Sequence, residues 1–316
     1  MQAAASSPAQ LSLEAKLRER LASGDAAVGA AGPALRRLLE EGANPLLGED
    51  IVAGVRGMAS DLARQLIEAR AQVPSEGATI GVAAGPALAG EIVRSPAMLG
   101  HLHALALEWQ LTQRLQARLV VDPVLPPLLQ RAANMPDLAA SAPAMLLLAS
   151  QARFCQAQRR MQLPLGELPG DLLHGALLAM RALAGSDADD QSAMADAAIR
   201  ASHDESESRL GLLSRFVAAM DETALGALSL KDAGAAVFLT ALALASGQDR
   251  DLAVLSTDQS QYVLLALSLR AAGLTGEGAA QQLLLLHPDL ALPDELGELS
   301  CDSAAAILAG TPQGGV

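Results

Sequence analysis

Along most of the chain, hydrophobic residues recur at spacings of three and four, which is the period of an amphipathic α-helix. Residues 49–73 show this pattern clearly. The apolar stripe of this segment consists of Ile51, Val55, Met58, Leu62, Leu66, Ala69 and Val73, with Arg56, Asp61, Arg64 and Glu68 off it. We expect Asp50 to cap the helix and Pro74 to end it, because proline offers no backbone N–H to the next turn.

Two more helices have recognisable ends. Ser95, followed by a proline, is a typical helix start, since serine accepts a hydrogen bond from the first turn and proline fits its first position. Another helix is expected to begin at Pro143 and to end near Arg159, where positive charge suits the helix dipole. Strand-like composition is confined to residues 78–85 and 118–125, and prolines cut both segments short. The pattern therefore predicts an all-α protein.

The C-terminal part of the chain contains an internal similarity at a constant offset of 44 residues. The matched pairs are Leu230/Leu274, Gly234/Gly278, Ala235/Ala279, Ala236/Ala280, Leu239/Leu283 and Leu242/Leu286. A period of this length lies in the range of about 40–47 residues typical of HEAT and armadillo repeats. Gly247 and Gly273 each end a Leu/Ala-rich segment, where glycine is the preferred left-handed cap. These features predict stacked helical hairpins, in a solenoid-like or irregular multi-helical array, with the repeated leucines buried between layers.

Residues 236–288, with SLRAAGLTGEGAAQQLLLL as the nearest stretch, resemble the C-terminal part of a family of uncharacterised helical proteins from alphaproteobacteria. The likeness rests on short Leu/Ala-rich helices that end in glycine. It covers about a sixth of the chain and contains no catalytic motif. The resemblance implies a helical-repeat fold of the HEAT or armadillo kind, and it implies no functional residue.

Charge divides the chain into two parts. Residues 1–183 carry sixteen basic and sixteen acidic side chains, whereas residues 184–316 carry six basic and nineteen acidic ones, so the formal net charge of −13 belongs to the C-terminal part. A loop-like segment at 184–193 marks the change and favours a domain boundary there. The predicted organisation is a frayed tail at 1–10, a charge-balanced helical array at 11–185, an acidic helical-hairpin array at 190–309 and a tail at 310–316.

The composition restricts the classes of binding partner and the cell compartment that we expect for this protein. An acidic chain lacks the basic face that nucleic acid requires, so we expect no nucleic-acid binding. A membrane-spanning helix needs about 20 mostly apolar residues, whereas the longest uncharged stretch, 233–248, has sixteen residues and includes Gly, Ser, Thr and Gln. The N-terminus lacks a secretory signal and two cysteines make no disulfide framework, while the Arg-, Ala- and Leu-rich composition is typical of a GC-rich bacterial genome. We therefore expect a bacterial, cytoplasmic protein without a membrane span.

Sequence motifs for catalysis or cofactor binding, such as GxxxxGK[ST], HExxH and GxSxG, do not occur. In the acidic segment DADDQSAMADAA, Ser192 and Ala198 stand where an EF-hand needs glycine and glutamate. His101 and His103 are about 200° apart around a predicted helix, so we expect no shared metal, with one ring packed and the other exposed. The sequence thus predicts no enzyme activity, no cofactor and no metal site.

His203 and Asp204 are one pair with a mechanistic interpretation. On a predicted helix rich in polar residues, they are similar to the phospho-acceptor site of bacterial dimerisation–phosphotransfer helices, where the imidazole is the nucleophile and the carboxylate assists proton transfer. The Arg-Thr-Pro that usually follows that site, and the glycine motifs for ATP, do not occur. The position of His203 also has a structural explanation, because it falls on the same stripe as Ile199 and Leu210, where a half-buried packing role is sufficient. Phosphotransfer through His203 is the alternative function.

Arg153, Arg159 and Arg160 form a small basic cluster near Phe154. The end of a helix, whose dipole favours positive charge, explains their position. The functional interpretation is a docking site for an acidic partner, or for the acidic half of the same chain. The leading prediction is a non-catalytic helical scaffold or adaptor that binds another, unidentified protein along a helical surface.

Overall fold

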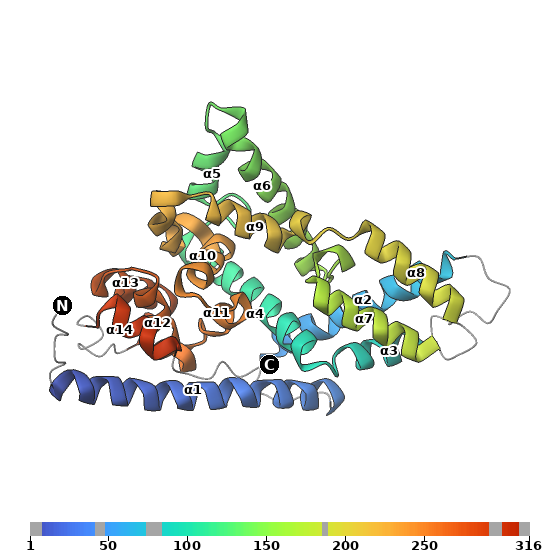
Figure 1. Cartoon of the computed structure of the whole chain (residues 1–316), viewed down its shortest axis with the longest axis horizontal. Helices are drawn as coiled ribbons and strands as arrows, with labels where there is room; N and C mark the ends of the chain where they lie inside the picture. The colour runs from blue at the N-terminus through green and yellow to red at the C-terminus, as the bar shows by residue number, and fades with distance from the viewer. Residues whose placement is uncertain (1–7, 42–47, 74–83, 185–188, 291–298, 310–316) are drawn as a thin grey trace, which may run out of the picture. The chain divides into compact units, whose positions relative to one another are not determined.

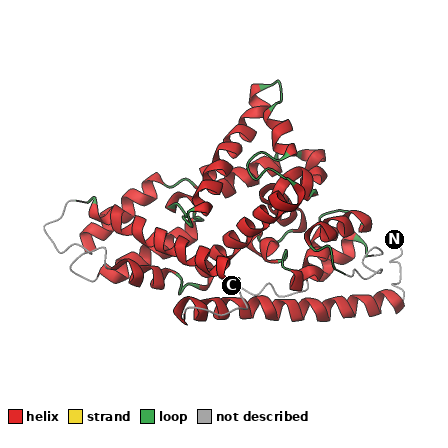
Figure 2. Ribbon diagram, turned by 180° about the vertical axis from the view of Figure 1, so that it is seen from behind, coloured by secondary structure: helices red, strands yellow, loops and turns green. Residues whose placement is uncertain are grey.

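The helical character of the chain is evident in the computed structural model, which describes residues 8–41, 48–73, 84–184, 189–290 and 299–309. Figure 2 shows these residues as helices joined by loops, with no strand among them. The predicted all-α class is confirmed. The strand-like stretch at 118–125 is a helix end followed by a loop, and most of 78–85 lies outside the described residues. No helix in the described ranges is long and apolar enough to cross a lipid bilayer.

The chain divides into two compact units. The central unit consists of residues 32–216, and the terminal unit combines residues 1–31 with residues 217–316. This division differs from the boundary expected near residues 185–190. That expectation rested on charge, which is a property of the surface, whereas compactness follows from the packing of helices against each other.

The central unit is organised around α2. Its elements, after the end of α1 (Pro8–Glu41), are α2 (Glu49–Ala71), α3 (Gly85–Ile92), α4 (Pro96–Leu119), α5 (Pro127–Ala133), α6 (Leu138–Arg159), η2 (Leu165–Glu167), α7 (Gly170–Ala184), α8 (Asp189–Ser202), η4 (Glu205–Glu207) and α9 (Arg209–Ala218). α2 contacts α3, α4, α7 and α8, and α4 contacts α6. α8 contains part of the acidic segment, yet it packs with helices that precede it. The segment expected to be a loop at 184–193 is therefore helical from residue 189.

α2 follows its predicted pattern, with two differences. The buried members of its stripe are Ile51, Val55, Met58, Leu62 and Leu66. Gly48, not Asp50, precedes the first helical residue, and Asp50 lies in the first turn, where its charge still suits the helix dipole. Asp61, expected on the polar side, is buried because it accepts a hydrogen bond from the Leu163 N–H at 3.1 Å. Pro74 lies outside the described residues.

The predicted ends of α4 and α6 are mostly correct. Ser95 caps α4, and its Oγ accepts a hydrogen bond from an N–H of the first turn at 3.3 Å. α6 ends at Arg159 as predicted, but it begins five residues before Pro143. The Ala-rich residues ahead of the proline favour helix, and the Ser141 N–H already bonds to the Asp137 carbonyl at 3.0 Å.

The terminal unit surrounds a buried helix. Its elements, after the first part of α1, are η5 (Asp221–Leu228), α10 (Leu230–Ser246), α11 (Arg250–Leu255), η6 (Gln259–Gln261), α12 (Tyr262–Ala271), α13 (Gly276–Leu286) and α14 (Cys301–Ala309). α12 contacts α10, α13 and α14, which gather around it in Figure 1. Residues 263–270 are buried at every position. Apart from Ser268 and Arg270, these residues are apolar, and a helix that is apolar on nearly all sides is expected to occupy such a central place.

Polar side chains fix the edges of the terminal unit. Arg270, buried on α12, donates from Nε to the Leu299 carbonyl at 2.9 Å, and its other nitrogens bond to the carbonyls of Leu299 and Leu274. Gln261 donates to the Gly24 carbonyl at 3.0 Å and so joins η6 to α1. A Cβ added at Gly24 would lie 2.5 Å from the Gln261 Oε1, so a larger residue at position 24 would displace the end of the Gln261 side chain. The buried guanidinium of Arg270 and the buried amide of Gln261 thus both have backbone carbonyls as hydrogen-bond partners.

The predicted burial of the repeated leucines is confirmed. Leu239, Leu242, Leu283 and Leu286 are between 0% and 3% exposed. Gly247 and Gly273 have positive φ angles, +70° and +97°, as expected for helix caps. The two copies differ at their matched glycines, because Gly234 has a non-helical backbone (φ 70°, ψ 174°) that interrupts α10, whereas Gly278 lies in the continuous first turn of α13. The 44-residue repeat itself stays a prediction.

Candidate functional site

An ion pair between Arg209 and Glu108 lies in the interior of the central unit. Arg209 is at the start of α9 and Glu108 is in the middle of α4. The contact is bidentate, with Nη1–Oε1 at 2.7 Å and Nη2–Oε2 at 3.0 Å. The side chains are 2% and 0% exposed. Two full charges are therefore removed from water, which is favourable only with good geometry and further hydrogen bonds.

Neighbouring residues supply those further contacts. The guanidinium carbon of Arg209 lies 3.6 Å from the centre of the Phe154 ring, a cation–π contact. Its Nη1 also approaches the Gln151 Oε1 at 3.4 Å, and its backbone N–H donates to the Glu167 Oε2 at 2.7 Å. Four elements, α4, α6, η2 and α9, thus meet at one arginine.

Burial and charge act in opposite directions on the groups of this cluster. Burial alone would lower the pKa of Arg209, but the charge and hydrogen bonds of Glu108 outweigh it and the pKa is raised. Burial raises the pKa of the Cys155 thiol to about 11, against the opposing charges of Arg209 and Arg159. The thiol is therefore protonated near neutral pH, and a protonated thiol is neither a nucleophile nor a metal ligand.

The chemistry of the cluster is structural. Neither charged side chain of the pair is accessible to a dissolved substrate. Gln151, beside the pair on α6, donates to the Pro123 carbonyl at 3.0 Å and fixes the loop that follows α4. The pair therefore sets the position of α9 and of this loop against α4 and α6.

Sequence reasoning missed this pair, although a signal was present. Glu108 and Arg209 are 101 positions apart, so local spacing gives no hint of their contact. However, Glu108 is the only charged residue between Arg94 and Arg114. A single charge in a long uncharged helical segment indicates a buried partner, because an isolated buried charge is costly.

His203 does not lie on a helix, so that part of the prediction is wrong. α8 ends at Ser202, and His203 and Asp204 form the connection to η4. The Asp204 carboxylate accepts hydrogen bonds from the Ser206 N–H (2.9 Å) and hydroxyl (2.7 Å), and these bonds lower its pKa. Such local bonds from Asp and Ser compete with a helical backbone and favour a turn.

The imidazole of His203 is held by a backbone carbonyl. Its Nε2 lies 2.9 Å from the Leu168 oxygen, and since a carbonyl only accepts, Nε2 carries the proton. The ring therefore fixes the segment before α7 to the end of α8. Asp204 bonds to η4 rather than to the ring. The structure gives both residues local packing roles, and phosphotransfer through His203 stays a prediction.

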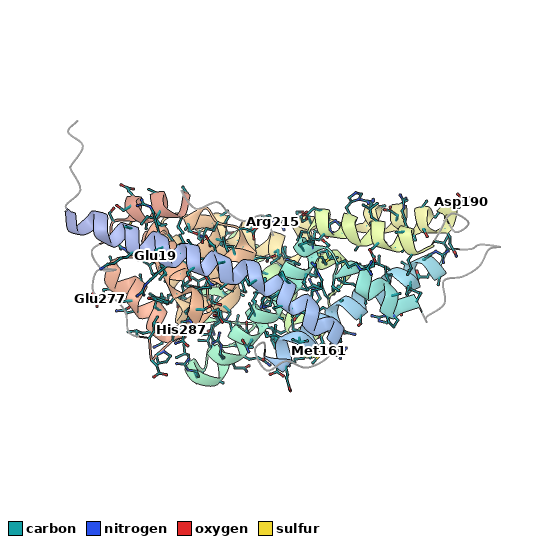
Figure 3. The ribbon with its side chains drawn as sticks, turned by 90° about the horizontal axis from the view of Figure 1, so that it is seen from below. Glu19, Met161, Asp190, Arg215, Glu277 and His287 are labelled. Atoms are coloured by element: carbon teal, nitrogen blue, oxygen red, sulfur yellow. The ribbon has the colours of Figure 1, made fainter. Side chains whose placement is uncertain are left out.

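The three arginines predicted as a docking site lie on the surface at the end of α6. Arg153, Arg159 and Arg160 are exposed. Within the described ranges, no hydrogen bond or ion pair joins their side chains to another residue. Met161, labelled in Figure 3, follows them and is 43% exposed. The surface formed by these four residues is called the α6 corner below.

The backbone of the α6 corner has a defined geometry. Met161 has a left-handed backbone (φ 55°), its N–H bonds to the Gln158 carbonyl, and the N–H of Gln162 bonds to the Ala157 carbonyl. This pair of bonds is the Schellman pattern that ends many helices, usually with glycine in the left-handed position. Here a methionine occupies that position instead.

α2 holds the α6 corner in place. A Cβ added at Gly57 would lie 2.4 Å from the Met161 Cβ and 2.9 Å from its carbonyl oxygen, so glycine allows the corner to approach α2. Beyond the corner, Asp61 accepts from the Leu163 N–H, and Gln65 bonds to both the Leu163 carbonyl (2.8 Å) and the Leu165 N–H (3.0 Å). The arginines therefore project from a rigid base.

The histidine pair of α4 differs from its prediction. His101 and His103 are both buried, whereas one of them was expected to be exposed. α4 is covered on several sides in this region, so positions on opposite faces are both removed from water. Across the part of the chain that the structure describes, no group of three or more His, Cys, Asp or Glu side chains is arranged to hold a metal ion.

Compared with protein-family models, with curated proteins and with solved structures, the chain has no significant match. The resemblance of residues 236–288 to alphaproteobacterial helical proteins therefore stays an expectation.

Proposed function

We propose that the protein is a non-catalytic adaptor of the bacterial cytoplasm, which binds an acidic segment of another protein at the α6 corner. The supporting observation is that Arg153, Arg159 and Arg160 are exposed and unpaired within the described chain, on a corner that α2 holds rigidly. The cytoplasmic and bacterial setting is supported by composition alone.

Arginine suits this role because its planar guanidinium binds a carboxylate through two parallel hydrogen bonds. Three such groups at the end of one helix favour a segment with several Asp or Glu residues. A rigid corner also lowers the ordering cost of association, since α2 already fixes the backbone that carries Arg159 and Arg160.

Met161 adds an apolar contact to the α6 corner. A non-glycine residue in the left-handed region costs roughly 1–2 kcal/mol, and glycine would remove that cost at this position. Retaining an exposed, flexible methionine there favours a role in contact with a partner, because methionine adapts to irregular apolar surfaces.

The test is affinity capture from an extract of the source organism, with the purified full-length protein as bait. One variant reverses the charge of the corner: Arg153→Glu, Arg159→Glu and Arg160→Glu. A matched control reverses three other exposed arginines of the central unit, Arg56, Arg118 and Arg215. Both variants change the net charge equally.

We expect proteins captured by the wild type to be retained by the control and lost with the corner variant. Their release should also increase with salt, because exposed charges are screened within about 10 Å at 0.1 M ionic strength. Equal losses with both variants would indicate a general charge effect, and retention by the corner variant would contradict the proposal.

A further inference from the structure

The outer face of α6, before the arginines, is apolar and exposed. Met145 and Leu146 are 53% and 57% exposed. Ala142 and Ala149 are exposed on the same side, because positions i, i+3, i+4 and i+7 share one face of a helix. These four residues are called the α6 stripe. The opposite side of α6, with Ala144, Leu147, Phe154 and Cys155, is buried.

The first half of α6 contains no charge on either side. From residue 138 to residue 152 there is no Asp, Glu, Lys or Arg. A surface helix of a globular protein normally carries polar residues on its outer face. α6 forms a hairpin with α5, shown in green in Figure 1. Between residues 142 and 149, the exposed side chains of α6 are Ala, Pro, Met and Leu. A contiguous apolar surface of this kind indicates a contact with another molecule.

We propose that the occupant of the α6 stripe is the α6 stripe of a second copy of this chain, in an antiparallel arrangement. An antiparallel pair of helices places residue numbers with a constant sum opposite each other. With the symmetry centre between Met145 and Leu146, Met145 faces Leu146 of the second copy, and Ala142 faces Ala149. All four residues of the stripe are then covered at once.

Residue size and charge agree with this register. The alanines at both ends allow the two helices to approach closely, while the larger side chains fill the centre. Arg153 of each copy comes to lie near the start of the other copy's α6, where Asp137 is exposed and of opposite charge. A two-fold contact requires a self-complementary patch of this type.

The proposed contact shares Arg153 with the α6 corner, but it does not depend on the adaptor function. Arg159 and Arg160 lie beyond the paired segment, so each copy keeps these two arginines of the α6 corner accessible. The paired stripe, from Ala142 to Ala149, is only about two helical turns long. So small an area is typical of weak, reversible association.

The first measurement is sedimentation velocity of the full-length protein from about 1 µM to about 1 mM, a range that detects weak interfaces. The mass should rise with concentration from 32.3 kDa towards twice that value. Leu146→Glu should weaken the association by roughly tenfold or more, because it places a charge in the apolar centre. The control Leu178→Glu, at an exposed leucine of α7, should leave it unchanged.

The second measurement tests the register by disulfide cross-linking, in a Cys301→Ser background; Cys155 is buried. Ala142→Cys and Ala149→Cys proteins should cross-link when mixed, and neither should cross-link alone. Cross-linking of either variant alone would indicate a parallel or shifted arrangement and would overturn the register. A constant monomer mass up to about 1 mM, without cross-linking of the mixture, would overturn the proposed contact, whatever the result of the capture experiment.

Discussion

Removing one charge of the Arg209–Glu108 pair is expected to destabilise the central unit strongly. Glu108→Gln keeps the shape of the side chain and one acceptor oxygen, but it removes the negative charge. Arg209 remains 1% exposed and keeps its positive charge, because its guanidinium cannot deprotonate at accessible pH. The substitution therefore leaves a buried cation without a counter-charge.

The expected magnitude follows from the desolvation of that cation. Breaking a buried ion pair costs about 3–5 kcal/mol, and a typical domain is stable by about 5–15 kcal/mol. The ring of Phe154 and the oxygen of Gln151 remain and offset part of the loss. Replacing both partners, as Glu108→Gln with Arg209→Met, removes both charges, so this double variant should lie within about 2 kcal/mol of the wild type.

Urea unfolding followed by tryptophan fluorescence measures these values. Trp109 is the only tryptophan of the chain and it neighbours Glu108 on α4, so its signal reports the central unit and not the terminal unit. The free energy of unfolding comes from linear extrapolation, provided that the slope is the same in all variants.

The double variant decides whether the pair acts as a unit. A coupling energy of about 2 kcal/mol or more between the two sites is expected for such a contact. If Glu108→Gln costs less than about 1 kcal/mol, or if the double variant equals the sum of the single variants, the pair does not hold α9 as argued.

Three further predictions concern packing and reactivity. Leu239→Ala should cost about 2–5 kcal/mol in thermal or urea unfolding of the terminal unit, against less than about 1 kcal/mol for the 43% exposed Leu284, and equal costs would show that α10 is not packed as described. Gly57→Ala should cost about 1–3 kcal/mol in urea unfolding, since its Cβ would meet the backbone after α6 at 2.9 Å, and a neutral effect would mean that the α6 corner shifts freely. With iodoacetamide at pH 8, Cys301 should be modified while Cys155, whose pKa is raised to about 11 by burial, reacts only after unfolding; equal rates by mass spectrometry would contradict its burial.

The all-α class and the core helices followed from the sequence because burial leaves a periodic trace. The part of the α2 stripe from Ile51 to Leu66 recurs at helical spacing and is buried, and so are the four leucines matched between α10 and α13, Leu239, Leu242, Leu283 and Leu286. Local chemistry likewise placed the cap at Ser95 and the left-handed glycines. These features depend on neighbouring residues only.

Features that depend on distant contacts were not predictable in the same way. The sequence pattern places Asp61 on the surface. Asp61 is buried because the backbone N–H of Leu163, 102 positions away, donates a hydrogen bond to it. The sequence pattern likewise predicts a helix at His203, but α8 ends before it because Asp204 forms a turn with Ser206. Of the candidate site, the exposed arginines were predicted, but the rigid base beneath them depends on Gly57, whose role appears only when α2 and the end of α6 are side by side.

The proposed adaptor function is tested most directly by photo-cross-linking in cells of the source organism. A photoreactive amino acid would replace Gln156, which is exposed on the outer side of α6 between Arg153 and Arg159, and in a control it would replace the exposed Gln116 of α4. We expect a discrete adduct with another protein from position 156 only. No adduct from position 156, or the same adducts from both positions, would contradict the α6 corner as the docking surface.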